Sequence, residues 1–151
     1  VYLLPTLPEG DHTATLRVWD VFNNAAEKSI SFRVNKDLAP QVAASQAFPN
    51  PALLGSPITF EIFTNTPGEE MSLTIELFDF TGRCVAKSPS FSLVSPSQGS
   101  IRIPWTPTTS YQTSPIRGLY IYRCTLSGSN GKSATTMGKL LLEESSSGAT
   151  K

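Results

Sequence analysis

Apolar and polar residues alternate with a period of two along most of this chain, as in β-strands that bury one face. Within residues 57–65, for example, Ile58, Phe60 and Ile62 share one side and Thr59 lies on the other. The segments that carry this pattern are 41–48, 57–65, 71–80, 83–88, 100–105, 118–128 and 132–143. No segment keeps the period of a helix. The pattern predicts an all-β protein, an immunoglobulin-like antiparallel β-sandwich of six to seven strands in about 100 residues.

The same alternation occurs earlier, in residues 1–36. Leu16 and Val18 share one strand face there, and Ile30 and Phe32 share the apolar face of a second strand. Two strands cannot bury such a face by themselves. We interpret the segment as a β-hairpin that belongs to an upstream β-sandwich domain.

Domain boundaries follow from changes in composition. Val1 opens inside a strand-like run and is not an initiator Met, so we expect a C-terminal piece of a longer protein. Residues 37–44 are polar and contain a proline, which indicates a linker before a sandwich domain at 45–143. The Ser- and Pro-rich segment 89–99 is expected to be a loop. The small, polar tail 144–151 is expected to be disordered.

Charge and hydropathy limit the partners. Twelve Lys and Arg residues balance twelve Asp and Glu residues, so no basic field is available for nucleic acid or anionic lipid. No apolar run approaches the roughly 20 residues of a membrane helix. We therefore expect no nucleic-acid partner and no direct membrane insertion. The oligomeric state stays open.

The two cysteines are predicted to stay reduced. Cys84 follows a turn, and if Val85 continues the inward face, Cys84 points to solvent. Cys124 shares the inward parity of Tyr122. One outward and one inward residue are poorly placed for the Cα separation of roughly 4.4–6.8 Å that a disulfide needs. A bulge at Gly82 would reverse the parity of Cys84.

The sequence contains no recognisable catalytic or metal-binding arrangement. The single histidine, His12, lies in a turn-like EGDH segment, away from either cysteine. Nucleophile pairs, phosphate-binding glycine loops and metal-ligand spacings are all missing. The carboxylates of Glu61, Glu76 and Asp79 occupy outward strand positions or turns. We predict no catalytic residue, no cofactor and no metal site.

The aromatic residues allow two interpretations. Tyr120 and Tyr122 lie two residues apart on one strand face, which favours packing in the core. A carbohydrate-stacking face is the alternative, and it would need a row of exposed aromatic rings. Trp105 follows Pro104 at a strand end and is expected to cap the core. The alternative function is thus a carbohydrate-binding or adhesive β-sandwich at the cell surface.

Five motifs in order suggest a family: AFPNPA (47–52), LTIELFDFTGRCV (73–85), IRIPW (101–105), RGLYIYRC (117–124) and MGKLLL (137–142). Their order and spacing resemble the C-terminal sorting domain of the type IX secretion system of Bacteroidota. The family usually has a larger apolar residue where this chain has Cys124. The resemblance implies a noncatalytic domain that directs its parent protein through that secretion system.

The upstream segment, LPEGDHTATLRVWDVFNNAAEKSISFRV (7–34), resembles the end of the gingipain-like sortase family of the same system. This implies a parent cysteine peptidase whose catalytic residues lie upstream and which keeps its sorting domain. The resemblance further implies transit through the periplasm and a final place at the cell surface and outer membrane. The implied partners are the type IX translocon and the outer-membrane β-barrel protein PorV.

We expect the closing hairpin to have two roles. Its inward face completes the sandwich, and an exposed edge or end carries recognition. Its glycines permit tight turns or a close approach of the backbone. The candidate recognition residues are Gly118, Tyr120, Lys132, Gly138, Lys139, Leu140 and Leu142.

Overall fold

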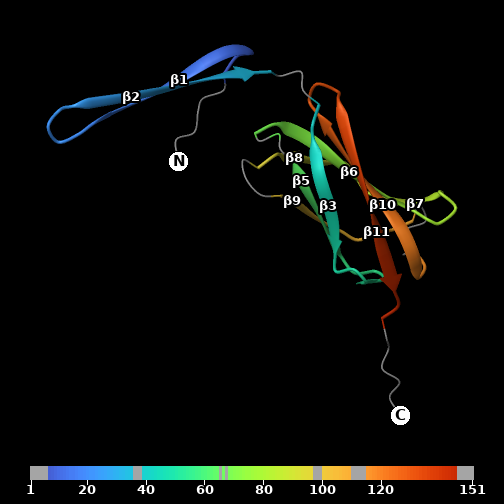
Figure 1. Cartoon of the computed structure of the whole chain (residues 1–151). Helices are drawn as coiled ribbons and strands as arrows, with labels where there is room; N and C mark the ends of the chain where they lie inside the picture. The colour runs from blue at the N-terminus through green and yellow to red at the C-terminus, as the bar shows by residue number, and fades with distance from the viewer. Residues whose placement is uncertain are drawn as a thin grey trace. The chain divides into compact units, whose positions relative to one another are not determined.

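The computed structural model describes residues 7–35, 39–64, 66, 68–96, 100–109 and 115–145. Contacts divide the chain into two compact units, Val1–Leu38 and Ala39–Lys151. The described residues form eleven strands and no helix (Figure 1). The all-β prediction is therefore confirmed.

The first unit is an antiparallel hairpin of β1 (Gly10–Trp19) and β2 (Ala25–Val34). Its turn is held by Asp20, whose Oδ1 accepts hydrogen bonds from the backbone N–H groups of Phe22 and Asn24, each at 2.9 Å. The side-chain hydrogen bond from Asn24 holds the pKa of Asp20 below its ordinary value. Asn23 has a φ of 62°, as expected of an Asn in such a turn.

The second unit is built from two sheets whose strands are mostly antiparallel (Figure 1). The three-stranded sheet has the order β3-β5-β9: β3 (Val42–Phe48), β5 (Ile58–Thr64) and β9 (Ile101–Trp105). The larger sheet has the order β4-β11-β10-β6-β7, and β8 pairs with the other end of β6. Its strands are β4 (Ala52–Leu53), β6 (Glu70–Phe78), β7 (Cys84–Lys87), β8 (Phe91–Val94), β10 (Gly118–Gly128) and β11 (Ser133–Glu143).

The chain changes sheets between β3 and β4. β3 pairs antiparallel with β5, whereas β4 pairs with the last strand, β11, and in the parallel direction. This crossing at one edge is how the first strand of an immunoglobulin-like sandwich is shared between its sheets. Among the described strands β9 pairs with β5 alone, so Pro104 occupies an edge strand where a missing N–H is tolerated.

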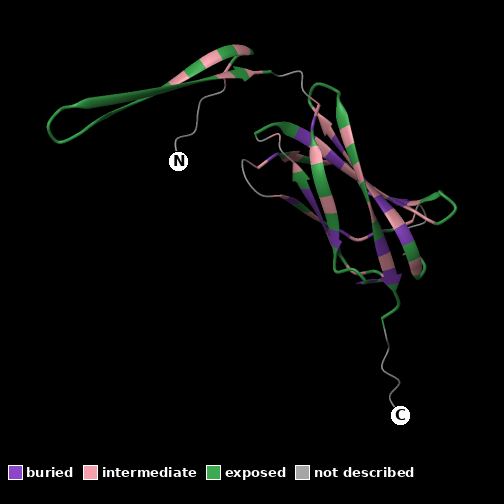
Figure 2. Cartoon of the chain, viewed as in Figure 1, coloured by how far each residue is buried: buried purple, intermediate pink, exposed green. Residues whose placement is uncertain are grey.

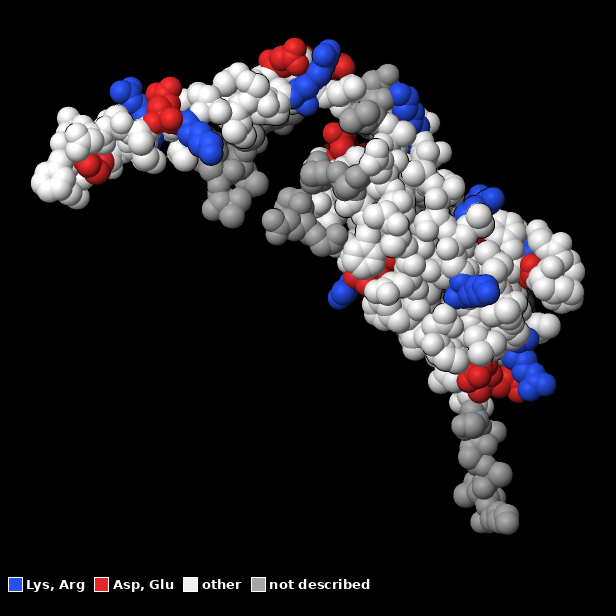
Figure 3. All heavy atoms as spheres, in the orientation of Figure 1, with Lys and Arg blue, Asp and Glu red and all other residues white. Residues whose placement is uncertain are grey.

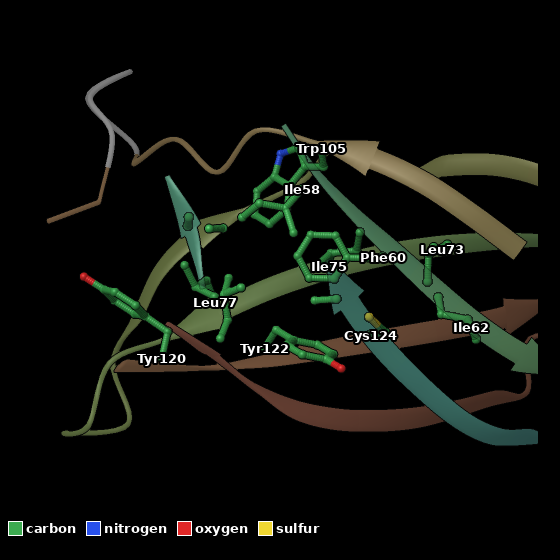
Figure 4. Close-up of a cluster of buried hydrophobic side chains, with 14 of the residues drawn as sticks. Ile58, Phe60, Ile62, Leu73, Ile75, Leu77, Trp105, Tyr120, Tyr122 and Cys124 are labelled. Carbon is green, nitrogen blue, oxygen red and sulfur yellow. The ribbon is translucent and has the colours of Figure 1, made fainter. Parts of the chain in front are cut away.

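The core lies between the two sheets. Buried residues alternate with partly buried ones along β6 and β10 (Figure 2). Phe60 is central: its ring meets Tyr122 edge-on at 5.3 Å between centroids and lies 5.9 Å from Trp105 (Figure 4). Trp105 is buried at the end of β9, as predicted. Aromatic contacts of this kind add to the stability gained from area burial.

Several sequence predictions need correction. The expected loop 89–99 contains a strand, β8, and β4 was not predicted at all. The expected linker 37–44 is shorter, because β3 begins at Val42. Residues 146–151 of the expected disordered tail lie outside the described residues.

Two single residues also differ from expectation. The inward position after the β6–β7 turn belongs to Ala86, because the register shifts there and places Val85 in an irregularity of β7. His12 lies within β1, where its Nε2 is 2.7 Å from the carbonyl oxygen of Pro8 and its ring stacks on Phe32.

Both cysteines are free, as predicted. Cys84 is exposed and pairs with the outward Phe78, whereas Cys124 is buried among the core side chains. Burial raises the pKa of the Cys124 thiol to about 12. This sulfur therefore behaves as a small apolar side chain and not as a nucleophile.

Candidate functional site

The closing hairpin of β10 and β11 places its predicted residues on two different faces. Gly118 pairs with Leu142, and Tyr120 pairs with Leu140. These residues point inward, and both leucines and the tyrosine are buried. The Tyr120 hydroxyl donates to the Ile116 carbonyl at 2.7 Å, and burial is the main reason that its pKa is raised.

Gly138 has a specific reason to be glycine. It pairs with Tyr122, whose ring lies across it; a Cβ at this position would stand 2.3 Å from the Tyr122 hydroxyl oxygen. That hydroxyl lies 3.4 Å from Ser45 Oγ, which in turn lies 3.0 Å from the Thr136 hydroxyl. The glycine thus permits a contact that connects β11 to β3. This is the close approach predicted for the hairpin glycines, and its role is packing.

The two lysines lie elsewhere. Lys132 is in the turn between β10 and β11, while Lys139 projects from β11 on the outward side of the sheet. The seven predicted residues are therefore not one recognition surface. Five of them, Gly118, Tyr120, Gly138, Leu140 and Leu142, form the inward face of the hairpin.

The outward face of the hairpin carries the exposed groups, and we call it the outer hairpin face. Leu119 and Met137 are largely exposed there. Leu119 pairs with Leu141, and Lys139 lies between Met137 and Leu141 along β11. The strands β10 and β11 alternate strictly, so this face could have been derived from parity once Tyr120 was placed inward. The outer hairpin face consists of Leu119, Ile121 and Arg123 of β10 and Met137, Lys139 and Leu141 of β11.

Charged side chains pair across the outward faces of β6, β7 and β10. The view of Figure 3 shows broad uncharged areas over the second unit, with scattered groups of Lys, Arg, Asp and Glu. Glu76 of β6 receives a hydrogen bond from Arg123 at 2.5 Å and lies 3.3 Å from Lys87. The Arg123 hydrogen bond is the main cause that lowers the pKa of Glu76. The Arg123 guanidinium also covers the Phe78 ring, 4.7 Å from its centroid.

The opposite sheet holds a carboxylate that the sequence placed wrongly in solvent. Glu61 has the outward parity of β5, yet its side chain is covered by Gln46, Ser100 and Arg102, all of which donate hydrogen bonds to it. The bond from Ser100, then those from Gln46 and Arg102, lower the pKa of Glu61 to about 2. Arg102 lies 2.7 Å from the carboxylate, so the charge is fully paired. Glu61 stabilises this surface and offers no free base.

The first and last sequence motifs meet in space. Asn50, from AFPNPA, donates from Nδ2 to the Lys139 carbonyl at 2.9 Å, and its Oδ1 accepts from the Leu141 N–H at 3.0 Å. Just beyond, Ala52 pairs with Leu142, and Leu54 N–H donates to the Glu143 carbonyl. The Asn50 amide therefore replaces a neighbouring strand along the outer edge of β11.

Other kinds of site are not evident in the part of the chain that the structure describes. No three acidic, His or Cys side chains there gather as metal ligands would. No helix among those residues is long and apolar enough to cross a membrane. Tyr120 and Tyr122 face the core and do not form a sugar-stacking platform.

Comparison with known proteins shows what this chain resembles. No protein-family model and no curated protein matches it. Among solved structures, it matches dimeric latent PorU from Porphyromonas gingivalis with a TM-score of 0.57 and 37% sequence identity. The match covers 94% of this chain.

The chain is similar to the C-terminal region of PorU. It spans 13% of the length of that PorU chain, so the two proteins are compared over a small part of PorU. The resemblance to the sortase family that the sequence motifs indicated is therefore confirmed as a similarity to the C-terminal region of PorU. The sorting role of residues 45–143 stays a prediction.

Proposed function

We propose that residues 45–143 form a noncatalytic sorting and anchoring domain. In this proposal the domain directs a PorU-like parent protein through the type IX secretion system and, through PorV, holds it at the outer membrane and cell surface. Any peptidase activity belongs to upstream parts of the parent. The hydrogen bonds between Asn50 and β11 carry the proposal, since they join the first and last family motifs into one folded unit.

The outer hairpin face is the surface that we assign to the sorting partner. The inward residues Tyr120, Leu140 and Leu142 are committed to the core, so they cannot touch a partner without unfolding. Met137 and Lys139 project from the same strand to the outside. An exposed apolar patch with few charges is typical of a protein interaction surface.

The test uses the parent protein with this chain at its C-terminus, expressed in a bacterium with a type IX secretion system. Surface delivery is measured by protease accessibility on intact cells, and PorV binding by co-purification. Met137→Asp with Lys139→Glu is expected to reduce both. The matched control is Val94→Asp on β8, because Val94 is 61% exposed and Met137 is 66% exposed.

Equal thermal unfolding of the variants would establish that folding is unchanged. Normal delivery and PorV binding of the Met137/Lys139 variant would overturn the assignment of this face. Normal delivery of a parent that lacks residues 45–143 would overturn the sorting function itself.

A further inference from the structure

A pocket of about 420 Å³ lies at one end of the sandwich, beside the β6–β7 turn. Its walls come from that turn, from Val85 of β7, from Thr109 and from residues 115–120, which lead into and begin β10. The volume is within the roughly 300–1,000 Å³ of ligand sites in proteins. The pocket shares Leu119 with the outer hairpin face, and its other lining residues lie outside that face.

Several large apolar side chains at the rim of this pocket are exposed to solvent. Phe80 is 94% exposed at the tip of the turn, and Ile116 is 79% exposed across from it. Leu119 is also largely exposed, and Val85 contributes to the wall. Single exposed apolar residues are common, but several of them around one hollow mark an interaction site.

Hydrogen bonds hold the backbone of the turn that carries Phe80. Asp79 Oδ1 accepts hydrogen bonds from the N–H and hydroxyl of Thr81 and from the N–H of Arg83, at 2.5–3.1 Å. Gly82 completes the turn with a φ of 83°. The Thr81 side-chain hydrogen bond is the main cause that lowers the pKa of Asp79. Because the backbone of the turn is already ordered, binding at Phe80 loses conformational entropy mainly from the side chain.

The charge of the pocket wall is positive. Asp79 is neutralised by Arg83, with 3.2 Å between the Arg83 Nε and the Asp79 Oδ2. Arg117 also lines the pocket, and no described acidic side chain forms an ion pair with it. The wall thus presents one guanidinium in excess, beside apolar groups.

We propose that this pocket binds a peptide segment of a protein partner: an apolar side chain, preferably aromatic, with a carboxylate next to it. The apolar side chain fills the space between Phe80 and Ile116, and the carboxylate pairs with Arg117. The open position at the end of the sheets suits a side chain presented by another protein. This inference goes beyond the proposed sorting function, and its test involves no secretion.

The experiment is a two-dimensional NMR titration of the ¹⁵N-labelled full chain with blocked dipeptides. Acetyl-Phe-Asp-amide is expected to shift the backbone amides of Phe80, Gly118 and Leu119 in a saturable manner. Acetyl-Phe-Asn-amide, which lacks the charge, is expected to bind about twofold to fivefold more weakly, as for loss of an exposed ion pair. Acetyl-Ala-Asp-amide is expected to cause no saturable shift.

Variants assign the two parts of the site. Arg117→Gln should make the Phe-Asp and Phe-Asn probes bind equally, and Phe80→Ser should weaken both. Arg33→Gln in the first unit removes the same charge elsewhere and should change nothing. The proposal is overturned if the three amides do not respond, if the neutral probe binds as well as the acidic one to the unaltered chain, or if octanoate binds as tightly as the acidic dipeptide.

Discussion

The two long hairpins of this molecule have nearly the same design but different surroundings. β1 and β2 are ten residues each, β10 and β11 are eleven, and both pairs keep one antiparallel register throughout. In the closing hairpin the inward side chains are buried against the other sheet, whereas in the first hairpin Leu16, Val18 and Ile30 remain exposed (Figure 2). Alternation therefore predicts pairing, but burial requires a second layer.

Different side-chain contacts hold the strand register of the two hairpins. In the first hairpin Thr15 and Ser29 hydroxyls lie 2.8 Å apart, and Thr13 and Ser31 form a longer contact of the same kind. In the closing hairpin the register is set by the core partners, such as the Tyr122–Gly138 pair. Cross-strand polar pairs contribute only roughly 0.2–1 kcal/mol each, so a hairpin held by them gains much less than one in a core.

The largest expected effect comes from one leucine in each hairpin. Leu140 is 0% exposed, so Leu140→Ala should lower the free energy of unfolding by about 2–5 kcal/mol through lost burial and a cavity. Leu16 is 67% exposed, so Leu16→Ala should change it by less than about 0.5 kcal/mol. Urea unfolding of the full chain measures each change in its own unit: Trp105 fluorescence in a Trp19→Phe background for Leu140→Ala, and Trp19 fluorescence in a Trp105→Phe background for Leu16→Ala. Similar losses for the two leucines would refute the contrast.

The next effect tests the glycine that only the closing hairpin needs. Gly138→Ala would place a methyl group against the Tyr122 ring, so the ring must move, at about 1–3 kcal/mol of overpacking. In a Tyr122→Ala background the same change should cost less than about 0.5 kcal/mol, because the obstructing ring is gone. The measurement is the same unfolding experiment. An equal cost in both backgrounds would mean that Gly138 is required for its backbone conformation instead.

The comparison also explains how much of the fold the sequence could predict. β10 was predicted with its observed bounds because strict alternation and flanking glycines define it. β4 and β8 were missed because strands of two and four residues are too short to establish a period. The shift at Val85 could not be predicted either, since an irregular pairing depends on the partner strand.

The candidate site was predicted less well than the fold. The motifs located the closing hairpin, but motif membership does not distinguish core residues from exposed ones. Tyr120 and Leu140 belong to the motifs because they pack, and Met137 was overlooked although it projects outward. The burial of Glu61 could not be predicted for a different reason. Gln46 and Ser100 are distant from it in sequence and contact it only in the folded sheet.

A third test uses acid, which should act on the sandwich through Glu61. Its folded-state pKa of about 2 is below the ordinary value of 4.5, so the folded state binds fewer protons than the unfolded state. The stability that Glu61 contributes is therefore fully present above pH 4.5, and it declines as the pH falls toward 2. Unfolding of the full chain at pH 2–6 should show a shallower decline for Glu61→Gln than for the unaltered protein. Parallel curves would mean that the hydrogen bonds from Ser100 and Gln46 do not favour the charged form.

The smallest expected effect concerns one ion pair beside each hairpin. Arg123 and Glu76 approach to 2.5 Å in the second unit, and Lys87 supports the same carboxylate. Arg17 and Glu27 of the first hairpin are 3.9 Å apart, and both side chains are more than half exposed. Double-mutant cycles with Gln replacements should give a coupling of about 0.5–1 kcal/mol for the first pair and close to zero for the second.

Repeating the double-mutant cycles at higher salt concentration distinguishes the two ion pairs further. Coupling between exposed charges weakens as ionic strength rises, whereas a pair held by direct hydrogen bonds beside an aromatic ring is screened less. The Arg123–Glu76 coupling should therefore persist in 0.5 M salt, at about half its low-salt value or more. Equal couplings at both sites, or complete loss of the Arg123–Glu76 coupling in salt, would show that the sandwich strengthens its hairpin through apolar burial alone.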